Sequence, residues 1–113
     1  MSEQPDQLSH VDGVPVVRAA VEVDATNAAD LRSAILTALG DGAGRLIVDM
    51  SETEFCDSSG IRYLLLAHDE ATAHHAQLRL AVQPDGMVLR MLTLMGLHRV
   101  LQVHVSLDEA TAA

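Results

Sequence analysis

The chain has 113 residues, a length that fits one domain and leaves no room for a second. Sixteen acidic and seven basic residues give a net charge of −9 at pH 7, and such a surface repels nucleic-acid phosphates and anionic lipid headgroups. A single cysteine excludes an internal disulfide and a multi-cysteine zinc site. No signal peptide and no membrane-spanning apolar run is recognisable. We therefore expect a cytoplasmic domain with no direct nucleic-acid binding and no membrane insertion.

The N-terminal part predicts a tail followed by a hairpin. Residues 1–7 are polar and lack periodicity, so we expect a flexible tail there and the folded domain over 8–113. The pair Asp12-Gly13 signals a tight turn between strands. The β-branched run over 14–23 then predicts a second, antiparallel strand.

A first helix is predicted next, with Thr26 or Asn27 capping its free amide groups. Apolar residues recur at helical spacing over 28–39. Gly40 and Gly42 are expected to end this helix.

The rest of the chain alternates strands with helices. The apolar run over 46–48 predicts a strand that is covered on both faces. Five further elements are expected: a helix from Ser58 to about His74, a strand over 78–82, a helix from Pro84 to Leu92, a strand over 100–105 and a short helix capped by Ser106. The order β-β-α-β-α-β-α-β-α predicts a single α/β domain with a mixed β-sheet and helices.

Cys56 and three methionines are predicted to contribute to the core. Cys56 is expected to be a small buried residue rather than a nucleophile. Met87, Met91 and Met95 are four residues apart, a spacing that favours a buried helix face over an interface.

The segment most informative about function reads FCDSSG over 55–60, at a predicted helix start. A helix N-terminus exposes unpaired amides and favours anions, so a serine hydroxyl there can carry a phosphate. The same residues also make an ordinary N-cap, with Gly60 relieving crowding, and the pattern alone favours that interpretation.

Flanking residues add a family resemblance. Asp49-Met50-Ser51 followed by FCDSSGI over 55–61 resembles the signature of STAS domains, and in particular that of bacterial anti-sigma-factor antagonists. The segment 21–24 resembles the family's Gly-Glu-Leu-Asp, and 95–97 resembles its Ser-Gly-Leu. The resemblance covers nearly the whole chain and implies the STAS fold, with the same element order.

The resemblance also implies a regulatory cycle. An anti-sigma factor that is itself a serine kinase would bind the unphosphorylated protein and release its sigma factor. It would then phosphorylate Ser58, the complex would separate, and a serine phosphatase would reset the cycle. We expect the phosphate on Ser58 and not on Ser59, because the Ser59 hydroxyl is expected to bond backbone at the helix start.

Six residues are expected to form the partner-binding surface around that serine. Two acids would flank it, two residues would shape the helix start and two would touch the partner: Asp24, Asp57, Ser59, Gly60, Arg62 and Tyr63. Val21 replaces the family's usual Gly, and Arg62 replaces a frequent small residue, so the resemblance does not identify the kinase.

Three other functions fit the sequence less well: a scaffold subunit, a serine hydrolase and a metal-binding protein. The same fold also serves as a non-cycling scaffold subunit of transporter-associated or stress-signalling complexes, although the intact DSSG run favours regulation. A serine hydrolase is disfavoured because no histidine motif delivers a base and the Gly-x-Ser-x-Gly elbow is absent. The six histidines lack ligand spacing. We therefore expect no enzyme activity, no catalytic residue, no metal and no other cofactor.

Overall fold

The chain enters its sheet through the hairpin that Asp12-Gly13 predicts. In the computed structural model, which describes residues 7–112, β1 (Gln7–Val11) pairs antiparallel with β2 (Val14–Arg18). Asp12 and Gly13 have φ of 52° and 81°, the left-handed values that a two-residue hairpin turn requires. The expected flexible tail lies outside the described residues except for Gln7, which is the first residue of β1.

Parallel strands extend the sheet from β2. Within the described residues the sheet has five strands in the order β1-β2-β4-β6-β7, and all pairs after the hairpin are parallel. The added strands are β4 (Arg45–Met50), β6 (Gln77–Val82) and β7 (Gln102–His104). The predicted mixed sheet is confirmed.

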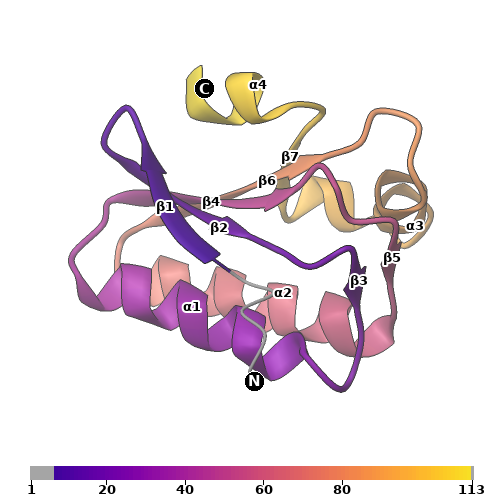
Figure 1. The fold of residues 1–113 in the computed structure, drawn as a ribbon, viewed down its shortest axis with the longest axis horizontal. Coiled ribbons are helices and arrows are strands. Elements are labelled where there is room, and N and C mark those ends of the chain that lie inside the picture. The colour runs from indigo at the N-terminus through magenta and orange to yellow at the C-terminus, as the bar shows by residue number, and fades with distance from the viewer. Residues whose placement is uncertain (1–6, 113) are drawn as a thin grey trace.

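Helices cover the two faces unequally (Figure 1). The longer helices α1 (Ala28–Gly40) and α2 (Ser58–Ala73) lie side by side on one face. The short helix α4 (Leu107–Ala112) lies on the other, capped by the Ser106 hydroxyl, which accepts from the Glu109 amide at 3.1 Å. Between them in the sequence come α3 (Met87–Leu94) and the 3₁₀ helix η1 (Leu97–Arg99).

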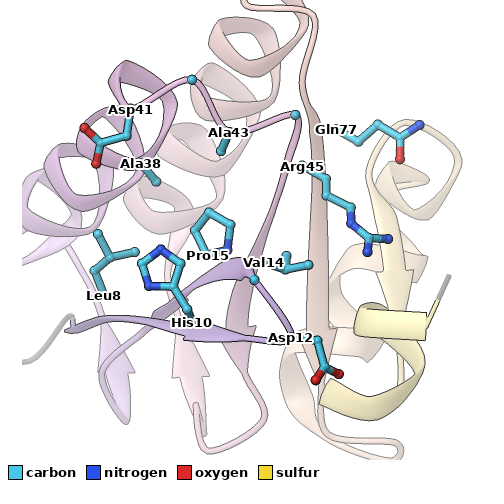
Figure 2. Close-up of a pocket in the computed structure, with 13 residues that line it drawn as sticks. Leu8, His10, Asp12, Val14, Pro15, Ala38, Asp41, Ala43, Arg45 and Gln77 are labelled. Carbon is cyan, nitrogen blue, oxygen red and sulfur yellow. The ribbon is translucent and has the colours of Figure 1, made fainter.

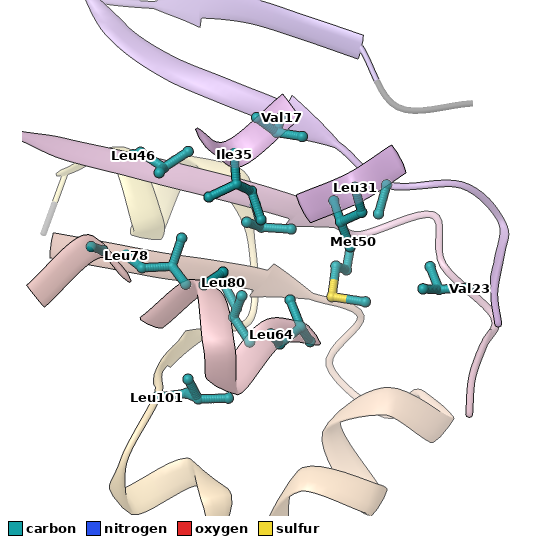
Figure 3. Packing of buried hydrophobic residues seen from close by; sticks show 14 of the residues in the cluster. Val17, Val23, Leu31, Ile35, Leu46, Met50, Leu64, Leu78, Leu80 and Leu101 are labelled. Atoms are coloured by element: carbon teal, nitrogen blue, oxygen red, sulfur yellow. The ribbon is translucent and has the colours of Figure 1, made fainter. Parts of the chain in front are cut away.

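The main core lies between the sheet and α1 and α2 (Figure 3). Alternate strand residues such as Leu46 and Met50 point into it and meet Ile35 and Leu64 of the helices. The intervening residues, including Ile47, form a smaller cluster beneath α4. Because both faces of β4 are buried, the prediction from its continuous apolar run is confirmed.

Arg79 ties α4 to the sheet. This buried side chain in β6 donates from Nη1 to the Ala110 carbonyl oxygen at 3.1 Å and from Nη2 to Gln77 Oε1 at 2.7 Å. A guanidinium without such acceptors would be costly to bury. The pairing therefore helps to hold the terminal helix against the sheet.

Two short strands depart from the sequence prediction. The strand predicted over 14–23 ends at Arg18, and β3 (Glu22–Val23) instead pairs in parallel with β5 (Phe55–Cys56) as a separate two-stranded sheet. The break arises where Thr53 Oγ1 donates to the Ala20 carbonyl at 2.8 Å, since this bond diverts the chain toward the loop after β4.

The third helix is also placed differently. It begins at Met87 rather than at Pro84, because the preceding residues form a turn in which the Gly86 amide donates to the Gln83 carbonyl at 3.2 Å. The prediction that its methionines face the core is wrong for two of the three: Met87 and Met95 are exposed, while Met91 is half-buried. Val88 and Leu92 fill the core instead.

Candidate functional site

The β3–β5 pair brings together two segments that are far apart in the sequence. Val23 pairs with Cys56, and the Asp57 amide donates to the Val23 carbonyl at 3.0 Å. Asp24 and Asp57 each follow a paired residue, so both lie where the two strands end. The predicted flanking acids therefore share one end of the two-stranded sheet, beside the start of α2 (Figure 1).

Asp57 forms the N-cap of α2. Its Oδ1 accepts a hydrogen bond from the Gly60 amide at 3.1 Å, and its backbone is extended. Ser58 is the first helical residue and is exposed, whereas Ser59 is half-buried. The predicted helix start is confirmed. It places the Ser58 hydroxyl in solvent at the positive end of a helix of 16 residues.

Gly60 lets α2 approach the two-stranded sheet closely. A Cβ built on Gly60 would lie 2.5 Å from Cys56 Sγ and 2.8 Å from Val23 Cγ1, distances that real Cβ atoms do not show. Gly60 is therefore required by packing, which places the start of α2 directly against β3 and β5.

Cys56 is a core residue, as predicted. Its side chain is fully buried. Burial, with a smaller contribution from the charge of Asp57, raises the pKa of the Cys56 thiol to about 12. The thiol therefore stays protonated at neutral pH and is a poor nucleophile.

Asp49 and Ser51, in the first half of the motif, shape the turn after β4. The Asp49 carboxylate accepts from the Ser51 amide at 3.0 Å and from the Ser51 hydroxyl at 2.6 Å. This turn directs the chain from β4 toward β5 and Ser58.

Asp24 organises the loop opposite Asp57. Its Oδ1 accepts from the Thr26 hydroxyl at 2.5 Å and from the Thr26 amide at 2.9 Å. These bonds, the hydroxyl first, hold the pKa of Asp24 below its ordinary value of 3.8. The carboxylate is thus ionised at neutral pH and adds negative charge near Ser58.

The predicted capping of α1 is only partly observed. Asn27 occupies the N-cap position but makes no side-chain bond to a helix amide. Its Oδ1 accepts from the Asp24 amide at 3.0 Å, and its Nδ2 donates to the Glu22 carbonyl at 2.8 Å. Asn27 therefore braces the loop that carries Asp24, a role that short-range capping patterns do not reveal.

A hollow of about 340 Å³ opens beside Ser58. Three predicted partner-binding residues, Ser59, Arg62 and Tyr63, line it together with Ala25 and Leu66. The sequence prediction did not include Leu66, although its spacing of seven residues from Ser59 places both on the same face of the helix. Nothing in the sequence pattern points to Ala25, which arrives from another loop.

The expected bond of the Ser59 hydroxyl to backbone is absent. Within residues 7–112, neither Ser58 nor Ser59 makes a side-chain hydrogen bond, and Ser59 lines the hollow instead. The preference for Ser58 as phosphoacceptor therefore depends on its greater exposure.

A larger hollow, of about 570 Å³, lies elsewhere (Figure 2). Leu8, His10 and Pro15 of the hairpin line it opposite Asp41 in the loop after α1. Arg45, also on its wall, begins β4, whereas Ser58 follows the other end of that strand. This hollow is therefore remote from the candidate site.

The described part of the chain holds no metal-ligand cluster: no three His, Cys, Asp or Glu residues within 7–112 are placed to share an ion. None of the helices in that range is long and apolar enough to cross a membrane.

Comparison with known proteins identifies the family. The STAS domain model matches residues 7–112, so the chain belongs to the STAS domain family. No curated protein matches the chain. The family resemblance read from the sequence and the α/β fold with its element order are both confirmed.

Several solved structures share this fold. An anti-sigma factor antagonist from Mycobacterium paratuberculosis is 25% identical, with a TM-score of 0.82, covering 95% of this chain and 90% of that one. The phosphorylated form of SpoIIAA from Bacillus is also 25% identical, with a TM-score of 0.67, covering 95% of this chain and 96% of that one. A putative antagonist from Thermotoga maritima, 19% identical with a TM-score of 0.81 over 95% and 92% of the two chains, shows the fold alone.

Proposed function

We propose that this chain is an anti-sigma-factor antagonist that is switched off by phosphorylation of Ser58. In the unphosphorylated state it binds an anti-sigma factor that is also a serine kinase, and so frees a sigma factor. The observation that carries the proposal is the exposed Ser58 hydroxyl at the first position of α2, flanked by its N-cap Asp57. The similarity to SpoIIAA, a protein with a phosphorylated form, supports it.

In this cycle the chain is the substrate rather than the enzyme. The kinase transfers the γ-phosphoryl group of ATP to Ser58 Oγ, and a serine phosphatase later removes it. Within residues 7–112 no side chain is hydrogen-bonded to the Ser58 hydroxyl as a base would be. The proposal therefore assigns this chain no catalytic residue, metal or cofactor, and a cytoplasmic location beside its kinase.

The local geometry favours a switch that acts on binding rather than on folding. A phosphate at the start of α2 meets unpaired helix amides and the positive end of the helix dipole, so the fold tolerates it. It adds about −1.5 to −2 charge at pH 7, beside the carboxylates of Asp24 and Asp57. Like charges brought together at an interface can cost several kcal/mol, and about 2.7 kcal/mol weakens a complex a hundredfold.

The hollow beside Ser58 is the proposed contact for the kinase. Arg62 and Tyr63 combine a cation with a ring, the side chains that most often dominate binding energy at interfaces. Because Ser59 lines the same hollow, a partner that fills it contacts the residue next to Ser58.

Kinase assays on serine variants test the proposal. Candidate anti-sigma serine kinases are incubated with ATP and the wild-type chain, Ser58→Ala or Ser59→Ala, and the intact mass and the phosphosite are measured. We expect one phosphate on the wild type and on Ser59→Ala, and none on Ser58→Ala. Phosphate on Ser58→Ala but not on Ser59→Ala would reverse the assignment. A stable kinase complex without any phosphate would favour the non-cycling scaffold role.

A further inference from the structure

The segment from Gly86 to Leu107 differs in charge from the rest of this acidic chain. It contains no Asp or Glu, although the whole sequence has sixteen, and it carries Arg90 and Arg99. Neither arginine makes an ion pair or a side-chain hydrogen bond within residues 7–112. Against a net charge of −9, α3 and η1 thus form a local basic surface.

The same surface is unusually apolar. Leu94 is 82% exposed, Met95 54% and Val100 50%, and Met87 is also exposed. Met87 and Leu94 are seven residues apart and so share the exposed side of α3, while Val88 and Leu92 on another side are buried in the core and half-buried Met91 packs against that core. Single exposed apolar residues are ordinary, but four of them on α3 and in the turns that follow it indicate an interaction surface.

A shallow hollow offers this surface a place for a side chain. It measures about 260 Å³ and is lined by Leu89, Arg90, Thr93 and Leu94, with Asp85 and Gly86 at the start of the helix. Asp85 contributes an acidic group to the lining. An apolar side chain entering here would contact Leu89 and Leu94, and Arg90 in the same lining offers a cation to a carboxylate.

We propose that the surface formed by Met87, Arg90, Leu94, Met95, Arg99 and Val100, the α3 face, docks an acidic amphipathic segment of a partner protein. The partner's apolar side chains cover the exposed leucine and methionines, and its carboxylates pair with the two arginines. Charge selects this occupant, because an acidic segment is attracted to the α3 face and repelled by the rest of the −9 surface. An anionic membrane would also face the acidic remainder of the surface, which repels it. A basic segment would be attracted to that acidic remainder rather than to the α3 face.

The α3 face lies near the phosphorylation site but does not depend on it. Helix α3 contacts β5, the strand that leads to Ser58, and the two lie at the same end of the molecule (Figure 1). One partner can therefore span both surfaces. The docking proposal depends only on the exposure and charge of the α3 face. It can therefore be refuted while phosphorylation of Ser58 is confirmed, and it can be confirmed while phosphorylation of Ser58 is refuted.

Peptide titration of the isotope-labelled full chain tests the proposal. The probe is a synthetic helical peptide with leucine at positions i, i+3, i+4 and i+7 and glutamate on its polar face. The comparison peptide carries lysine in place of every glutamate. We expect the acidic peptide to shift amide resonances over 87–100 and to bind at least about tenfold more tightly than the basic one. Equal or tighter binding of the basic peptide, or shifts confined to other elements, would overturn the proposal.

Variants separate charge from apolar contact. Arg90→Glu, Arg99→Glu and Leu94→Gln should each weaken the acidic peptide about tenfold. Arg18→Glu, at an exposed position in β2 outside the α3 face, is the control for each single arginine substitution and should have little effect. Leu94 is too exposed to be needed for the fold, and melting temperatures check this. Two results would assign the face to another occupant and refute the proposal: a dimer that Leu94→Gln dissolves, or binding of the wild type to phosphatidylglycerol vesicles.

Discussion

At the scale of single residues, Gly60 shows how packing and function meet at one position. Its missing side chain lets the start of α2 lie against Cys56 and Val23, and the same close approach places Ser58 next to the end of the β3–β5 pair. The DSSG run is therefore both an N-cap and a packing requirement. The crowding that the sequence pattern suggested is real, and it is what positions the candidate phosphoacceptor.

Replacing Gly60 by alanine should destabilise the protein. The new Cβ would meet Cys56 Sγ at 2.5 Å and Val23 Cγ1 at 2.8 Å, and overpacking of this kind costs about 1–3 kcal/mol. Alanine is the better helix former by about 1 kcal/mol, which offsets part of the loss. Urea unfolding measures the change. Gly44→Ala is the matched control because nothing lies within 4 Å of its Cβ position, and equal stability of the two variants would show that α2 has room to shift.

At the scale of elements, a short loop and a short helix are each held in place by a few side-chain hydrogen bonds. The Asp24 loop is held by Thr26 and Asn27, and it sets one side of the candidate site. Helix α4 is held by Arg79, and it covers the face of the sheet that α1 and α2 leave open. Each is stabilised by side-chain hydrogen bonds rather than by a long apolar face.

Thr26→Val should return the pKa of Asp24 toward its ordinary value. The Thr26 hydroxyl is the largest cause of the lowered pKa, so removing it reduces the preference for the ionised carboxyl. A carboxyl whose pKa is lower in the folded state stabilises the fold above its unfolded pKa, and this contribution is lost as pH falls through the folded pKa. Wild type should therefore exceed the variant in stability at pH 7, and the difference should shrink below about pH 3.8.

NMR titration of the Asp24 carboxyl measures its pKa, and urea unfolding at pH 7 and below about pH 3.8 measures the difference in stability. Thr72→Val removes an exposed hydroxyl that donates to the His68 carbonyl at 3.0 Å, and it serves as the control because no carboxylate is involved. A pH-independent difference between wild type and Thr26→Val would contradict the assigned cause.

Replacing Arg79 by methionine should loosen α4. The variant keeps much of the buried aliphatic volume but loses the bond to the Ala110 carbonyl, and hydrogen bonds to charged groups are worth about 1.5–3 kcal/mol. We expect a loss of that size in unfolding free energy and faster amide exchange over 107–112. Arg18→Met, at an exposed position in β2, should change stability by less than about 0.5 kcal/mol. Unchanged exchange in α4 would mean that its apolar contacts suffice.

At the scale of the whole molecule, charge is divided between two surfaces. The surface around Ser58 presents Asp24 and Asp57, whereas the α3 face carries two arginines, with Asp85 the acid at its edge. A phosphate on Ser58 adds negative charge to the first surface and leaves the charge of the second unchanged. Binding can thus be regulated at one place without disturbing the fold or the other surface.

Ser58→Asp should uncouple binding from stability. Its carboxylate lies at the helix N-terminus, where negative charge is favoured, so the melting temperature should stay close to that of the wild type. The affinity for the anti-sigma kinase should fall at least about tenfold. Ser58→Ala should bind but resist release by ATP. Calorimetry measures both affinities, and Ser33→Asp, an exposed change on α1, is the control for net charge.

Two results would contradict this prediction. Equal affinity of Ser58→Asp and the wild type would rule out a charge-based switch. A collapsed melting transition would show that Ser58 matters to the fold.

The sequence by itself determined the features that depend on neighbours along the chain. The Asp12-Gly13 turn, the Asp57 N-cap and the Ser106 cap follow from local backbone preferences, and the alternation of buried strands and helices follows from short periodicities. The motif around Ser58 is equally local, which is why the family could be recognised from its residues.

Only the tertiary structure decided what depends on distant segments. The pairing of β3 with β5, which places Asp24 near Asp57, joins stretches with no shared local pattern. Ala25 reaches the hollow beside Ser59 for the same reason. The methionine spacing predicted the wrong buried side of α3. Apolar residues occupy both sides of that helix, and packing against neighbouring elements selects Val88 and Leu92 for burial and leaves Met87 and Met95 exposed.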